Sequence, residues 1–397
     1  MDETPQTHSA RLLATVFVCA ATTLVGSVVA SGSNDTTPPG EAQFVVSTGA
    51  GRGLVENYDG VYETVDDGAH WVTITPPDFR TNPILLNDVQ GISSFGMDRI
   101  WLYVSANASY GSRLLYSWDA GRSWRSAPIV SEQTGTHPSS FLPGGAVPSV
   151  PSFSTAENGW ILATSGTAPG RGSLFRTSDG GVRWSFVAAA PFQGSIVFTN
   201  NLDGWGISAP TYTNLGAFKT PGGVLYRSTD GGNTWHAVQL PPLPGYPGAK
   251  ATFGLPAFFG QKDGVVAGRL YDTRTGTEPV VIDTTDDGGM TWHAHAAPQN
   301  PATRTYQQGS FTVPFVASTS KDWAMFTGPL LYATNDAGTT WTTTRPKLPK
   351  AAPTVESLDS ARPSLMWAQA HGHIGDIYPP YLLRSENDGR TWTVLSP

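Results

Sequence analysis

One eight-residue pattern occurs seven times in this chain of 397 residues. The pattern is Ser/Thr-x-Asp-x-Gly-x-x-Trp, and its first copy runs from Thr64 to Trp71. The seven tryptophans follow one another at intervals of 53, 60, 51, 57, 49 and 51 residues. A period of this length is typical of a supersecondary unit that is repeated, as in a propeller. These copies constrain the fold more than any other feature of the sequence.

The residue types of the pattern are those of a tight turn between two strands. An Asp in a turn can accept hydrogen bonds from the backbone amides that follow it, and Gly supplies a positive φ at little steric cost. The Trp offers a large apolar face to a neighbouring unit. The acidic or amide positions are Asp66, Asp119, Asp179, Asp230, Asp287, Asp336 and Asn387, and the aromatic positions are Trp71, Trp124, Trp184, Trp235, Trp292, Trp341 and Trp392. Because seven turns spread around a ring cannot converge on one substrate, we interpret these residues as structural.

This motif resembles the Asp box of the BNR-repeat proteins. That group includes sialidases, sortilin-like receptors, some xyloglucan-cleaving hydrolases and the photosystem II assembly factors. The resemblance covers about residues 41–397 and is closest to the assembly factors in repeat pattern, without their arginine patch. It implies an all-β fold, a single seven-bladed β-propeller with the box on the turn between the third and fourth strands of each blade. It also implies that a ligand would bind the opposite face.

A second, weaker repeat precedes most of the boxes. An acidic or amide residue is followed by a hydrophobic run, as in Asn158-Gly159-Trp160. This repeat predicts the second strand of each blade. The first repeat is short before Trp71, so we expect either a first blade of three strands or an edge supplied by residues 31–42.

The composition excludes several classes of function. The net charge is −7, only 14% of the residues are charged, and Lys and Arg form no stripe, so we expect no nucleic-acid partner. The single cysteine, Cys19, lies before the repeats, which leaves them without a disulfide or a thiol nucleophile. The sequence gives no cofactor motif. His371 and His373 with Asp376 lack a third ligand at a familiar spacing, so we predict no metal site.

The N-terminus predicts export from the cytoplasm. Residues 12–30 carry no charge and follow Arg11, which fits either a cleaved signal peptide or a single membrane anchor within residues 1–30. Residues 31–40 read as a flexible linker, and residues 41–397 form the propeller. We therefore expect a monomer that is secreted or held at the outer face of the cytoplasmic membrane, with no other membrane contact.

The face opposite the boxes is the predicted binding face. The connections expected there are long and carry aromatic and basic residues, which are typical of recognition surfaces. The candidate binding residues are Tyr212, Tyr246, Tyr271, Arg274, Arg304, Tyr306 and Tyr378. The partner is either a protein or a glycan.

Two functions fit this sequence. The first is a non-enzymatic binding or scaffold module of the cell envelope, because no catalytic constellation is visible. The second is a carbohydrate-active hydrolase, which needs two carboxylates roughly 5–10 Å apart. Its candidate acids on the loop face are Asp272, Glu278 and Asp376. No catalytic residue is assigned. Sialidase catalytic domains open with an aromatic-Arg-Ile-Pro motif, and this chain has no counterpart of it. The nearest string, Asp98 to Trp101, lacks both the aromatic residue and the proline.

Overall fold

A computed structural model gives the fold of most of the chain. It describes residues 42–395 except for residues 43, 50, 58, 82–88, 97, 105–112, 128–145, 166–169, 210, 213–217, 221–222, 243–245, 247–249, 272–278, 299–312, 351, 363 and 373–379. The predicted leader and linker lie outside the described residues.

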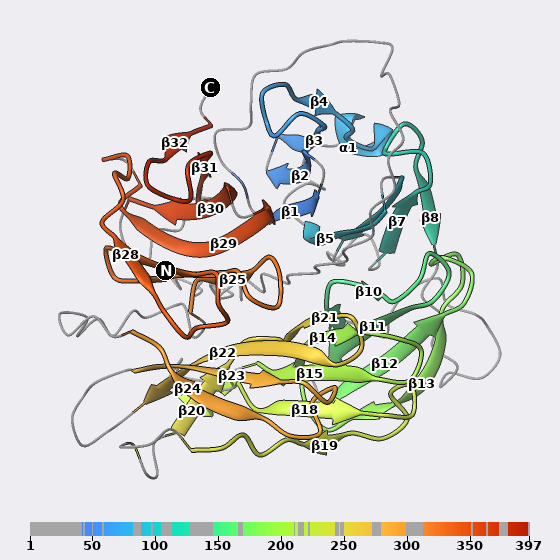
Figure 1. Ribbon diagram of the computed structural model, residues 1–397. Helices are drawn as coiled ribbons and strands as arrows, with labels where there is room; N and C mark the ends of the chain where they lie inside the picture. Colours follow the sequence, from blue (N-terminus) through green and yellow to red (C-terminus); the bar gives the residue numbers. More distant parts are fainter. Residues whose placement is uncertain are drawn as a thin grey trace, which may run out of the picture.

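Apart from one two-stranded hairpin, the described chain forms seven antiparallel sheets that follow one another around a ring (Figure 1). Each sheet comes from one contiguous stretch of chain and has a path of four strands in sequence order, which makes it a propeller blade. Blades are numbered 1 to 7 along the chain. Two blades have an additional strand, β9 and β21, beside the second strand. The predicted all-β, seven-bladed propeller is confirmed.

The first three blades span residues 44 to 190. Blade 1 consists of β1 (Phe44–Gly49), β2 (Arg52–Asn57), β3 (Gly60–Thr64) and β4 (Val72–Thr73). The short helix α1 (Pro77–Thr81) leads to blade 2, with β5 (Val89–Phe95), β6 (Arg99–Val104), β7 (Arg113–Ser117) and β8 (Arg125–Ala127). Blade 3 consists of β9 (Ala146–Pro148), β10 (Ser152–Phe153), β11 (Gly159–Ser165), β12 (Gly172–Thr177) and β13 (Ser185–Ala190).

The last four blades follow the same order. Blade 4 has β14 (Gly194–Phe198), β15 (Gly204–Ser208), β18 (Leu225–Ser228) and β19 (His236–Ala237). Blade 5 has β20 (Lys250–Phe253), β21 (Ala257–Phe259), β22 (Asp263–Tyr271), β23 (Val280–Thr285) and β24 (His293–Ala296). Blade 6 has β25 (Phe315–Ala317), β26 (Trp323–Thr327), β27 (Leu330–Thr334) and β28 (Thr342–Thr344). Blade 7 has β29 (Thr354–Arg362), β30 (Leu365–His371), β31 (Tyr381–Ser385) and β32 (Thr393–Val394).

The box turn lies between the third and fourth strands in all seven blades, as predicted. The weaker repeat is also placed correctly, since Trp160 lies on β11 and the matching Trp205 lies on β15, the second strands of their blades.

The ring closes without exchange of a strand between the first and last blades. Blade 1 has its own first strand, β1, so the expectation of a missing edge is wrong. Strand β1 contacts β29 of blade 7 on one side and β5 of blade 2 on the other. Just before β1, Ala42 donates its amide to Pro380 at 2.9 Å and accepts a hydrogen bond from the Gln369 side chain at 3.0 Å.

The hydrophobic core is divided among the seams between blades. Seven clusters of buried side chains are present, and each combines residues from two consecutive blades. In the seam that closes the ring, for example, Val55 and Trp71 of blade 1 pack with Trp367 and Leu382 of blade 7. Each box tryptophan lies in the seam with the preceding blade. The stability of the ring therefore comes from blade-to-blade packing.

The box glycine brings its turn against the preceding blade. A Cβ at Gly68 would lie 2.6 Å from the Trp367 ring of blade 7, and one at Gly389 would lie 2.2 Å from Leu331 of blade 6. The same close approach to the preceding blade recurs in every blade except blade 6. There the preceding blade has Val265 at the position where blades 2, 3, 4, 6 and 7 have a tryptophan, and the glycine faces Trp323 of its own blade.

Substitution of Gly68 tests whether this approach holds the ring closed. Gly68→Ala combines a positive φ of 86° with a clash against the buried Trp367 ring. We expect a loss of roughly 2–4 kcal/mol, of which about 1 comes from the backbone and the rest from overpacking. Gly260→Ala is the matched control, because φ is 77° and no atom lies within 4 Å of the added Cβ. Thermal unfolding at one scan rate compares the two, and equal losses would contradict the packing role of Gly68.

Candidate functional site

The box acids are committed to the turns that contain them. In all seven turns the Ser/Thr hydroxyl accepts a hydrogen bond from the glycine amide at 2.8–3.0 Å. The Asp or Asn side-chain oxygen accepts the amide four residues later at 2.8–3.0 Å. Hydrogen bonds from a threonine hydroxyl and its amide lower the pKa of Asp287 and of Asp336. Such carboxylates stay ionised and cannot act as general acids near neutral pH.

The predicted binding residues fall mostly outside the described part of the chain. Arg274, Arg304, Tyr306 and Tyr378 lie there, as do the candidate acids Asp272, Glu278 and Asp376.

Three candidates are described, at least in their backbone. Tyr212 lies in β16 (Thr211–Tyr212), which pairs with β17 (Phe218–Thr220), and Tyr271 ends β22. Tyr246 is half-buried and packs against the cluster between blades 4 and 5. The described residues therefore assemble no common site from these candidates.

Only one histidine of the pair His371 and His373 lies among the described residues. His371 is buried at the end of β30, and its Nε2 lies 3.0 Å from Glu356. His373 lies outside the described residues. Among those described, no three His, Cys, Asp or Glu side chains gather into a group that could hold a metal ion.

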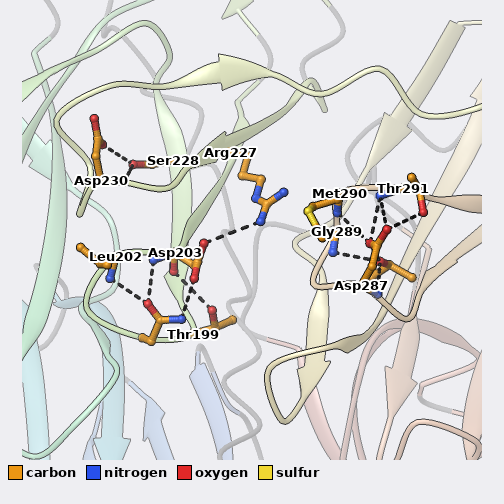
Figure 2. Close-up of polar contacts among 12 residues, drawn as sticks. Thr199, Leu202, Asp203, Arg227, Ser228, Asp230, Asp287, Gly289, Met290 and Thr291 are labelled. Atoms are coloured by element: carbon orange, nitrogen blue, oxygen red, sulfur yellow. Dashed lines mark hydrogen bonds and ion pairs between the residues drawn. The ribbon is translucent and has the colours of Figure 1, made fainter.

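The seam between blades 4 and 5 contains a hollow of about 430 Å³. It lies at the edge of the seam where the outer strand of blade 4 faces the box turn of blade 5. Arg227 and His236 line it from blade 4, and Met290 and Trp292 from blade 5. Figure 2 shows Arg227 between the two box turns, with its guanidinium directed to Asp203. The walls of the hollow are partly apolar and partly polar.

The same seam contains a buried acid that the turns do not use. Asp283 is fully buried on β23, and neither carboxylate oxygen has a hydrogen-bond partner among the described residues. It is opposite Val266 and two residues after Val281, both of which pack toward blade 4. Burial raises the pKa of Asp283 to about 7. Arg227 faces this seam from blade 4 and stacks over Trp205.

The repeat shows that Asp283 is an exception. Six blades have an apolar or aromatic residue two positions before the box Ser/Thr, and all six pack in the seam with the preceding blade. These residues are Tyr62, Leu115, Phe175, Tyr226, Tyr332 and Leu383. Our sequence reasoning missed Asp283, although alignment of the seven copies on their boxes would have found it.

Comparisons with known proteins give one moderate sequence similarity. No protein-family model matches the chain. The xyloglucanase Xgh74A of Acetivibrio thermocellus is 25% identical over 272 residues, which are 59% of this chain and 31% of that protein. The chain thus spans less than a third of the length of the curated relative that it matches.

Solved structures give a weaker likeness that concerns the fold. YCF48 from Cyanidioschyzon merolae is 15% identical with a TM-score of 0.47, over 77% of this chain and 85% of that one. The structure described as YCF48 bound to D1 peptide is 18% identical with a TM-score of 0.45, over 77% and 80%. The GH74 xyloglucanase from Xanthomonas campestris is 16% identical with a TM-score of 0.36, over 88% and 63%. The propeller assignment rests on the sheets themselves.

The pH dependence of unfolding tests the burial of Asp283. Burial raises its pKa from the ordinary value of 3.8 to about 7 in the folded protein, so the folded state keeps a proton that the unfolded state releases between these values. The free energy of unfolding should therefore fall as pH rises through this window, by up to about 1.4 kcal/mol per pH unit. Denaturant titrations at about pH 5 and pH 8 measure this slope.

Two variants separate charge from polarity at this position. We expect Asp283→Leu, which matches Leu115 and Leu383 in other blades, to lose the slope and to be more stable than wild type at about pH 8. Asp283→Asn should lose the slope while still burying a polar group. A wild-type slope in both variants would show that another group titrates.

Proposed function

We propose that this chain is an exported binding or scaffold module of the cell envelope. It holds a protein or glycan partner on the face of the propeller opposite the box turns. The proposal includes export through the N-terminal segment, either as a cleaved leader or as an anchor. Among the described residues no helix has the length and hydropathy to span a membrane.

The observation that carries the proposal is the hairpin β16–β17. It is inserted between the second and third strands of blade 4, in a sheet of its own that is separate from the blade. The connection between second and third strands is at the end of the blade away from the box. Backbone pairing places Tyr212 opposite Phe218, so two aromatic residues share one register position of the hairpin. Binding residues are common on segments that a rigid scaffold holds in place.

A second candidate function has one specific observation in its favour. The sequence similarity to a xyloglucanase supports a glycoside hydrolase on the same face. That activity would need two of the acids Asp272, Glu278 and Asp376 to lie across a sugar-binding cleft.

Crosslinking at the hairpin tests the binding proposal. A photocrosslinking residue at Tyr212 or Lys219 should capture one discrete partner on the cell surface, and an excess of uncrosslinkable wild-type protein should suppress capture. A Tyr212→Ala/Phe218→Ala protein should not suppress it. Val65, which is 57% exposed on a box turn, is the control position. Capture that is equal at Val65, or that the double variant suppresses equally, would contradict binding at this face.

A substrate screen separates the two candidate functions. The binding module should retain glycans or proteins without turnover. If the protein hydrolyses a xyloglucan oligosaccharide, and Asp272→Asn, Glu278→Gln or Asp376→Asn abolishes this activity, the protein is a hydrolase and the scaffold proposal is wrong.

A further inference from the structure

We propose that the hollow between blades 4 and 5 binds a carboxylate carried on an apolar body. This site lies beside the box turns, so it is distinct from the partner face proposed above and does not depend on it. The ligand is either a small organic acid or the carboxyl terminus of a peptide, and the shared chemistry is what the hollow recognises.

The first observation is a break in the repeated hydrogen bonding of the box tryptophans. In five blades the indole Nε1 donates to the carbonyl of the box glycine at 2.9–3.1 Å. In blade 2, Trp124 donates to Ile74 of the preceding blade at 2.7 Å. Trp292 is 8% exposed and lines the hollow, yet its Nε1 has no hydrogen-bond partner among the described residues. The break marks this seam as different from the others, although the Nε1 itself has no surface open to the hollow.

The second observation is the charge of the walls. Arg227 is a permanent cation at the hollow, and none of the lining residues is acidic. It forms an ion pair with Asp203, whose Oδ1 lies 3.7 Å from the guanidinium, which is longer than a hydrogen bond. Arg227 is stacked over Trp205 with 5.3 Å between the guanidinium carbon and the ring centroid, which fixes its plane. A fixed guanidinium is suited to two parallel hydrogen bonds with a carboxylate.

The neighbouring seam has an arginine at the same position with a closer side-chain partner. Arg176 of blade 3 has the same place before its box and stacks over Trp160 at 5.1 Å. Its terminal nitrogen donates to Asn158 at 3.1 Å. The corresponding residue of blade 4 is Asp203, and its contact is the longer one described above. Arg227 therefore has capacity for a further acceptor where Arg176 has an acceptor already.

The third observation is the apolar part of the walls. Val238 and Pro241 follow the outer strand of blade 4, and Met290 faces them from the box turn of blade 5. Met290 is 71% exposed, the largest exposure among the big apolar side chains of the described residues. A methionine at such a position can adjust to the shape of an apolar group, and covering it removes apolar surface from water. These contacts require an apolar body behind the carboxylate.

Methyl NMR of the full chain tests the proposal. The chain has five methionines, and the buried Met325 and Met366 report on the fold while Met290 reports on the hollow. Titration with 3-phenylpropanoate should shift the Met290 methyl signal alone, with a dissociation constant on the order of 1 mM. Its neutral amide should bind at least about tenfold more weakly. Equal binding of acid and amide, or no shift of Met290 up to about 20 mM acid, would overturn the proposal.

Two arginine variants assign the site. Arg227→Met should weaken binding at least about tenfold, whereas Arg176→Met, the matched change in the neighbouring seam, should leave it unchanged. Trp292→Phe keeps an aromatic wall and removes a donor that has no accessible surface, so it should leave binding unchanged within about twofold. Unchanged binding by an Arg227→Met protein whose Met325 and Met366 signals are native would overturn the site.

A pair of capped peptides distinguishes the sources of the carboxylate. An N-acetylated dipeptide ending in phenylalanine is compared with its C-terminal amide. Tighter binding of the peptide acid than of 3-phenylpropanoate identifies a chain terminus, and the reverse order identifies a small organic acid. If neither the peptide acid nor the free acid binds more tightly than its own amide, the hollow recognises only apolar surface and the proposal is wrong.

Discussion

The ring depends on the seating of the box glycine against the blade before it. The hydroxyl and the carboxylate or amide of each box fix the turn from within, and in every blade except blade 6 the glycine lies against the preceding blade. A side chain there would collide with the neighbour, as Gly68 and Trp367 show at the closing seam. Because the closing seam repeats a contact found in five other seams, the first and last blades join as those blades do, and no strand has to be exchanged.

This arrangement puts the core into the seams. A single blade is a small sheet with two apolar faces, and it becomes stable only when both faces are covered by other blades. The box tryptophan is the largest part of that cover, and in two seams the second-strand tryptophan of the preceding blade adds a hydrogen bond to the next box, as from Trp101 to Gly180 at 3.0 Å. The seams are therefore also the places where one changed residue has the largest effect. Blade 5 illustrates this, since Asp283 and Trp292 both depart from the pattern and a hollow lies in the same seam.

The fold could be predicted from the sequence because its physical causes are local and repeated. The turn chemistry of each box is complete within eight residues, and the spacing of the copies determines the number of blades. The first strand of blade 1 was harder to predict. The box marks only the third and fourth strands of a blade, so β1 is recognised only by its pairing with β2. The hollow and the seam position of Asp283 depend on which residues of consecutive blades meet, and this becomes visible only when the copies are aligned and the register of each strand is known.

Native-state hydrogen exchange at the seven box glycines tests the central claim most directly. Each glycine amide donates to a Ser or Thr hydroxyl within its turn. Six of these glycines, all except Gly338, also lie against the preceding blade. The account predicts that these amides exchange as slowly as those of the inner strands, through opening of the ring. Gly260, which is exposed, provides the fast reference. Box glycines that exchange as fast as Gly260 would show that the turns open alone and do not hold the blades together.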